Sequence, residues 1–90
     1  MDLNLEYIGV IAAILTTSGF VPQVYKTLKT KEVKGISLSM YLVLFIGMVF
    51  WLIYGIRINS FSIILANIVS GLLVLMQIIA KIFYGKRENR

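Results

Sequence analysis

Three long stretches of this chain contain no charged side chain, and together they cover most of its 90 residues. They run from Tyr7 to Tyr25, from Gly35 to Ile56 and from Ile58 to Ala80. Each is about 20 residues long, the length that an α-helix needs to cross a hydrocarbon core roughly 30 Å thick. The sequence therefore predicts an all-α membrane protein, a single domain built as a bundle of three transmembrane helices. The expected bounds are about Leu5 to Thr27, Ser37 to Arg57 and Ser60 to Tyr84.

The composition excludes several other classes of protein. With 59% hydrophobic and 14% charged residues, a soluble fold would have no polar elements left to cover three such helices. The absence of cysteine and histidine excludes disulfides, thiol chemistry and imidazole metal sites. We find no nucleophile, base or metal constellation, so we expect neither an enzyme nor a cofactor. The net charge of +5 has a membrane explanation and does not indicate nucleic acid.

The basic residues predict one orientation, because short loops rich in lysine and arginine stay on the cytoplasmic side. They gather in the first loop and the tail, at Lys26, Lys29, Lys31, Lys34, Lys81, Lys86, Arg87 and Arg90. The start carries only Asp2 and Glu6, which also argues against a signal peptide, and the turn around Asn59 carries only Arg57. We expect a multi-pass protein of the cell (inner) membrane with its N-terminus outside and its C-terminus in the cytoplasm. All copies would insert alike, so a dimer would be parallel.

Pro22 is the one proline and lies in the first predicted helix. It removes a backbone N–H and its ring opposes the carbonyl of Ser18, so the helix should kink there. Gly19 adds flexibility at the same level. Two interpretations stay open, a hinge or an ordinary bend of a membrane helix, and the spacing alone favours the bend.

Trp51 and Asn67 are expected to lie at the same depth. The second and third helices run in opposite directions, and each of these residues is eight positions from the turn at Asn59. That distance is roughly 12 Å of helix, which puts an indole beside a carboxamide inside the hydrocarbon. An aromatic face and an amide suit a sugar, whose ring has an apolar face and whose hydroxyls donate and accept hydrogen bonds. On the residues alone, polar contact between helices is an equally good explanation of Asn67.

Two pairs of side chains could close a path on either side of this level. Phe20 and Met40 are each ten residues from Thr30, which predicts one depth for both on the inner side. Tyr54 and Arg57 follow Trp51 by one and two turns, towards the outer side. Ordinary core packing or anchoring at the membrane boundary would explain the same residues.

The charge-free stretches also bear on how transport would be driven. Proton-coupled or ion-coupled transport normally needs a titratable group within the membrane, and none lies in the three stretches. Gln77 is polar but does not titrate. A transporter with this sequence is therefore expected to work by uncoupled movement.

Several motifs, in this order, closely resemble the bacterial SemiSWEET transporters of the SWEET and PQ-loop superfamily. The resemblance spans nearly the whole chain, and its specificity lies in the spacing of the proline-glutamine pair from the tryptophan and asparagine. The motifs are Thr16-Thr17-Ser18-Gly19-Phe20-Val21-Pro22-Gln23-Val24, Gly35-Ile36-Ser37, Met40-Tyr41, Trp51-Leu52-Ile53-Tyr54-Gly55 and Ala66-Asn67.

The resemblance implies a parallel homodimer of three plus three helices that moves small sugars by alternating access. It implies that Trp51 and Asn67 of both subunits bind the sugar and that Pro22 and Gln23 form the hinge. The implied gates are, at the inner side, Phe20 and Met40 and, at the outer side, Tyr54 and Arg57. Members often add an arginine and an acid near the second turn; here Arg57 is displaced in register, and Asn59 and Ser60 supply no carboxylate.

A homodimer also follows from size, because three helices cannot enclose a sugar whereas six can. The expected partners are thus a mono- or disaccharide, a second copy of the chain and the lipid bilayer. Two alternatives stay open: transport of another small metabolite such as an amino acid, and a small structural subunit of a larger membrane complex.

Overall fold

The computed structural model describes residues 3–88, and this part of the chain forms three helices. They are α1 (Leu3–Thr30), α2 (Leu38–Arg57) and α3 (Phe61–Glu88). All three are long and apolar enough to cross a membrane, so the chain is a multi-pass membrane protein with the predicted all-helical fold. α1 and α3 continue beyond the charge-free stretches because the long side chains of lysines in their last turns can reach water from a helix that leaves the hydrocarbon.

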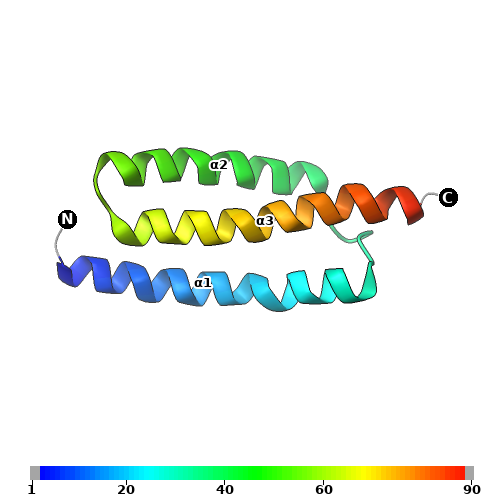
Figure 1. Cartoon of the computed structure of the whole chain (residues 1–90), viewed down its shortest axis with the longest axis horizontal. Coiled ribbons are helices and arrows are strands. Elements are labelled where there is room, and N and C mark those ends of the chain that lie inside the picture. The colour runs from blue at the N-terminus through cyan, green and yellow to red at the C-terminus, as the bar shows by residue number, and fades with distance from the viewer. Residues whose placement is uncertain (1–2, 89–90) are drawn as a thin grey trace.

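The helices are not arranged in chain order, because α3 lies between α1 and α2 (Figure 1). Among the described residues, α3 packs against both of the other helices, whereas α1 and α2 do not contact each other. The Cα atoms span 53 × 22 × 13 Å, and the smallest of these extents is close to the diameter of one helix, about 10–12 Å. One chain is therefore a flat layer of helices with two open broad faces.

The α2–α3 connection is a tight turn, and we call this end of the molecule the turn end. Asn59 adopts the left-handed conformation, with φ of 58°, which asparagine tolerates better than most residues. The backbone N–H of Ser60 donates to the Gly55 carbonyl at 2.9 Å, and that of Asn59 to the Ile56 carbonyl at 3.2 Å. A Cβ atom on Gly55 would lie 2.6 Å from Cγ2 of Ile63. The turn and this close approach fix the antiparallel register of α2 and α3.

α1 is joined to the beginning of α3 at the turn end. Ser60 caps α3, since its Oγ accepts from the Ile63 N–H at 3.3 Å. The same hydroxyl donates to Glu6 Oε1 at 2.8 Å, and the backbone N–H of Ser62 donates to Glu6 Oε2 at 2.8 Å. Gly9 lies so close to the Ser62 side chain that a Cβ would overlap it. These contacts set α1 parallel to α3 and hold the two helices together.

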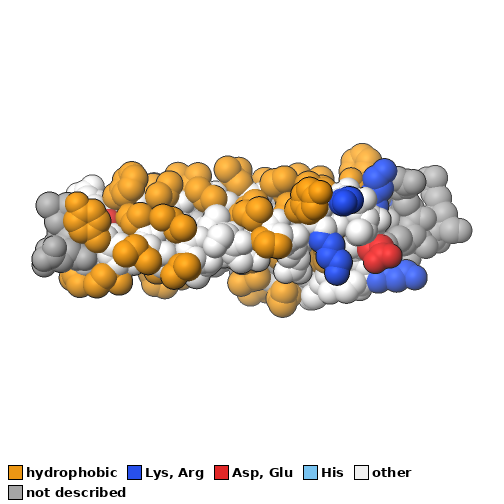
Figure 2. Space-filling view, turned by 90° about the horizontal axis from the view of Figure 1, so that it is seen from below, with side chains coloured by type: hydrophobic (Ala, Val, Ile, Leu, Met, Phe, Trp, Pro, Cys, Tyr) orange, Lys and Arg blue, Asp and Glu red, His pale blue; other side chains and the backbone are white. Residues whose placement is uncertain are grey.

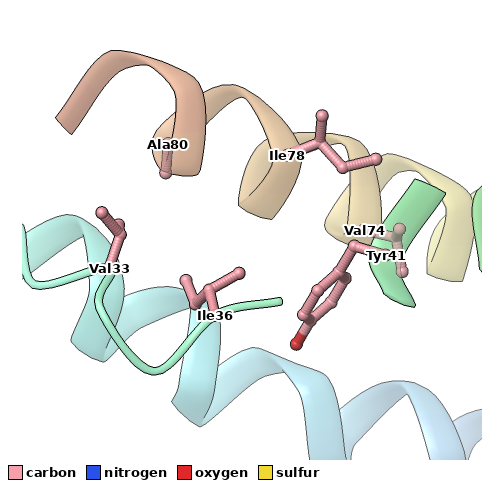
Figure 3. Close-up of a cluster of buried hydrophobic side chains, with 6 residues drawn as sticks. All are labelled: Val33, Ile36, Tyr41, Val74, Ile78 and Ala80. Carbon is pink, nitrogen blue, oxygen red and sulfur yellow. The ribbon is translucent and has the colours of Figure 1, made fainter. Parts of the chain in front are cut away.

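The opposite end, which we call the loop end, is closed by apolar packing. The loop of residues 31–37 joins α1 to α2 there, and Ser37 caps α2 by accepting from the Met40 N–H at 3.2 Å. Lys81 Nζ donates to the Val33 carbonyl at 2.8 Å. The loop-end cluster, drawn in Figure 3, is formed by Val33 and Ile36 of the loop, Tyr41 of α2, and Val74, Ile78 and Ala80 of α3.

Charge is distributed unevenly along the molecule. In Figure 2, lysine and arginine side chains gather towards the loop end, whereas apolar side chains cover the rest of this face. The charge-free middle of the layer is the part that matches the hydrocarbon core, and the basic end lies beyond it.

Candidate functional site

Trp51 of α2 and Asn67 of α3 line one concavity, as the depth argument requires. The concavity has a volume of about 190 Å³ and is widely open. Small side chains of α1, from Gly9 to Thr16, form its other wall. It therefore lies on the broad face where all three helices contribute, in the charge-free part of the layer and nearer to the turn end.

The Trp51 side chain lies on the surface of the single chain. Its side chain is 56% exposed, and its ring makes an edge-to-face contact with Tyr54, with the ring centroids 5.7 Å apart and the planes at 78°. Both rings also line a second, shallower hollow of about 430 Å³ together with Gly47 and Phe50. The contact steadies the indole while leaving one of its faces free for a ligand or a second subunit.

Asn67 is half-buried and uses little of its hydrogen-bonding capacity within the chain. Its Nδ2 donates to the Ile63 carbonyl one turn earlier at 2.8 Å. A carboxamide can make about four hydrogen bonds, so this intrahelical bond orients the group without using it up. Polar contact with another helix of the same chain does not explain Asn67, because the bond stays within α3.

The hydroxyl groups of α1 beside this site are mostly used locally. Thr16 donates to the carbonyls of Ala12 and Ala13 at 3.0 and 3.2 Å. Thr17, by contrast, shares a hydrogen bond with Ser70 of α3, with 3.4 Å between the two oxygens. The concavity therefore presents one carboxamide and one indole, and no charged side chain lines it.

Pro22 and Gln23 lie on the exposed side of α1, away from α3. They line a concavity of about 760 Å³ between α1 and the loop of residues 31–37. The Gln23 carbonyl accepts a hydrogen bond from Thr27 Oγ1 at 2.9 Å. The last two turns of α1, beyond Pro22, thus have open space on one side into which they can bend.

Phe20 and Met40 do not face each other within one chain. The register of α1 puts Phe20 level with Leu73 of α3, and the register of α2 puts Met40 level with Ile78. These levels differ by five residues, or about 7.5 Å of helix. Equal depth for these two residues requires a loop centred on Thr30, but α1 continues to Thr30 and the centre of the loop comes later. Phe20 is half-buried against the loop-end cluster, and Met40 is exposed.

At the turn end, Arg57 is exposed in the last turn of α2. The carboxylate that the sequence did not place near this turn is present in the structure: it comes from α1, as Glu6, and is bound by Ser60 and Ser62. Its position on the same side of the membrane as the turn was readable from the sequence, but its contact with α3 depends on the order of the helices in the layer.

Gln77 is the second residue whose importance the sequence did not indicate. It is 1% exposed, the largest of the fully buried side chains, and neither its nitrogen nor its oxygen has a hydrogen-bond partner among the described residues. A buried polar group without a partner destabilises a fold by about 1–3 kcal/mol, so this arrangement requires an explanation.

Comparison with known proteins gives consistent results. The family described as "Sugar efflux transporter for intercellular exchange" matches residues 5–89. The sugar transporter SemiSWEET of Leptospira biflexa serovar Patoc is 41% identical over 80 residues, which cover 89% of this chain and 94% of that protein. The crystal structure of a bacterial homologue of SWEET transporters has a TM-score of 0.85 at 42% identity and covers 92% of this chain and 99% of its own. The crystal structure of SemiSWEET in the inward-open conformation also has a TM-score of 0.85, at 32% identity, covering 97% and 99%.

Proposed function

Because the chain belongs to the family of sugar efflux transporters for intercellular exchange, we propose that it carries a small neutral sugar across the membrane as a parallel homodimer. The observation that carries this proposal is that Trp51 and Asn67 line one concavity and lie at the same level of α2 and α3. Movement is uncoupled, since no titratable side chain lines that concavity.

The requirement for two copies follows from the shape of one. A layer 13 Å thick cannot surround a ligand, and the concavity of about 190 Å³ is smaller than the roughly 300–1,000 Å³ of typical ligand sites. Two such faces opposed about an axis along the membrane normal would double the volume and bury the exposed indole of Trp51. Each copy would then contribute one Trp51 and one Asn67 to a single site.

The chemistry of the lining favours a sugar over a charged metabolite. The indole face stacks on the apolar face of a sugar ring, and the carboxamide donates to and accepts from its hydroxyls. An amino acid would bring a carboxylate and an ammonium group into the hydrocarbon, where each needs a fixed partner of opposite charge. The residues that line this concavity supply no such partner.

The proposed alternating access depends on the difference between the turn end and the loop end of the molecule. Pro22 and Gln23 are the hinge about which the last part of α1 bends into the adjacent hollow. Phe20 and Met40 contribute to the closure at the loop end, and Tyr54 and Arg57 to the closure at the turn end. The concentration of basic residues at the loop end supports a cytoplasmic position for that end, and therefore an N-terminus outside.

Substitution of Asn67 tests the site. In proteoliposomes, Asn67→Ala should abolish uptake of labelled sugars, while crosslinking shows the dimer unchanged. Ile68→Ala is the matched control, since Ile68 is the next residue of α3 and does not line the concavity, so its uptake should stay close to that of the unmodified chain. Full sugar uptake by Asn67→Ala would contradict the assignment of the binding site. Uptake of amino acids but not of sugars by the unmodified protein would contradict the proposed cargo.

Substitution of Pro22 tests the hinge separately. Pro22→Ala restores a backbone N–H and a straight helix, so transport should slow while equilibrium sugar binding keeps its affinity. Stopped-flow uptake together with binding calorimetry measures both quantities. An unchanged rate of transport would contradict the hinge without affecting the assignment of the binding site.

A further inference from the structure

Gln77 has properties that packing alone does not explain. Its carboxamide is fully buried, and both polar atoms lack a partner in the described part of the chain. A glutamine that joined helices would be seen bonded to one of its neighbours, as Thr17 is to Ser70. A group retained without a partner in one arrangement of the chain indicates that another arrangement provides one.

The face of α3 on which Gln77 lies leads away from the proposed sugar site. Asn67, Ser70 and Gln77 are separated by three and seven residues, so they share one side of the helix. Asn67 lines the concavity, and Ser70 lies one turn closer to the loop end. Gln77 is ten residues beyond Asn67, or about 15 Å along the helix. These side chains form a polar stripe from the proposed sugar site towards the loop end.

The loop-end cluster covers the last part of this stripe. Val74 and Ile78 adjoin Gln77 on α3, and the register of α2 puts Tyr41 at its level. Val33 and Ile36 extend over α3 from the loop, as Figure 3 shows. On the α1 side, the register puts the buried Val24 at the level of Gln77. The loop and Tyr41 are joined to α3 mainly by apolar contact, which can separate and re-form.

We propose that Gln77 is a second sugar-contacting residue, reached by the substrate after it leaves Trp51 and Asn67 and exposed when the loop and Tyr41 move away from α3. The proposal rests on the proposed function. A neutral carboxamide fits this role because it exchanges hydrogen bonds with hydroxyl groups and water. It also explains why the closed arrangement leaves the group without a partner.

The chain contains no cysteine, so Gln77→Cys introduces a single thiol that can report its exposure. A charged, membrane-impermeant methanethiosulfonate applied from the loop-end side should label it in liposomes. Leu72→Cys is the control: Leu72 lies on the opposite face of α3 and is 58% exposed in the single chain, where lipid would surround it. Labelling of Gln77→Cys no faster than that of Leu72→Cys would overturn the proposal.

A second variant tests contact with the sugar. Gln77→Met keeps the length of the side chain but removes its hydrogen bonds, so transport should slow by about threefold to tenfold, while sugar affinity at the Trp51 and Asn67 site stays the same. Unchanged transport would overturn the contact. A role in packing alone would instead leave transport by Gln77→Met unchanged and its melting temperature unchanged or raised, because the substitution removes an unpartnered polar group, and Gln77→Cys would not be labelled. Thiol labelling does not require a sugar. The exposure of residue 77 can therefore be measured even if the unmodified protein transports no sugar.

Discussion

The two ends of this molecule are closed by different physical means. At the turn end, a three-residue connection, a helix cap and a carboxylate from α1 hold all three helices with directed hydrogen bonds. At the loop end, the seven residues 31–37 bring Val33 and Ile36 onto α3, and the contacts are chiefly apolar. Hydrogen bonds and a close backbone approach favour one geometry, whereas apolar contact is non-directional and can be made in more than one arrangement. The comparison indicates a fixed end and a movable end.

The largest effect should come from filling the closest approach at the turn end. Gly55→Ala puts a Cβ 2.6 Å from Ile63 Cγ2 and 3.4 Å from the Ile64 nitrogen, so α2 and α3 must separate, at a cost of about 3 kcal/mol. Gly19→Ala is the control, because no atom lies within 4 Å of its Cβ position, and it should stabilise α1 by up to about 1 kcal/mol. Thermal unfolding in detergent measures both; similar effects would mean that the turn end is not tightly packed.

A smaller loss is expected at the loop end. Val33 is fully buried, and Val33→Ala removes apolar contacts and leaves a small cavity, which together should destabilise the fold by about 2 kcal/mol. Val43→Ala is the same change on α2 at a side chain that is 70% exposed, and it should have less than about 0.5 kcal/mol of effect. Equal melting temperatures for the two variants would show that the loop-end cluster does not hold the loop on α3.

The smallest expected difference in stability is between two helix caps of the same chemistry. Ser60 and Ser37 both accept a backbone N–H at the start of a helix, and loss of such a cap costs about 0.5–2 kcal/mol. Ser60→Ala should fall near the upper end of that range because it also removes a partner of Glu6, whereas Ser37→Ala should fall near the lower end because Ser37 is exposed. If the two variants lost equal amounts of unfolding free energy, the turn end would not be held more firmly than the loop end.

Much of the fold could be predicted from the sequence, because long charge-free stretches have few alternatives to membrane helices. The resemblance to SemiSWEET transporters is likewise confirmed. The shared depth of Trp51 and Asn67 was accessible because Asn59 marks the centre of a short turn. Their role in binding sugar stays a prediction.

Features that depend on the order of the helices could not be predicted. The contact of Glu6 with Ser60 requires α1 to lie beside α3, which no local pattern encodes. The levels of Phe20 and Met40 depended on where α1 ends, and charged residues near that end hid its continuation to Thr30. The burial of Gln77 depends on how the loop crosses α3, and a single polar residue in an apolar helix does not reveal that.

The central place of α3 has a consequence for how the protein is made. The ribosome releases α1 and α2 first, yet these two helices do not touch in the finished layer among the described residues. Each stays unpacked in the bilayer until α3 is inserted. α2 then pairs with α3 through their short turn, and α1 packs on the other side of α3. A nascent chain that stops before Phe61 would therefore lack the one helix to which both earlier helices bind.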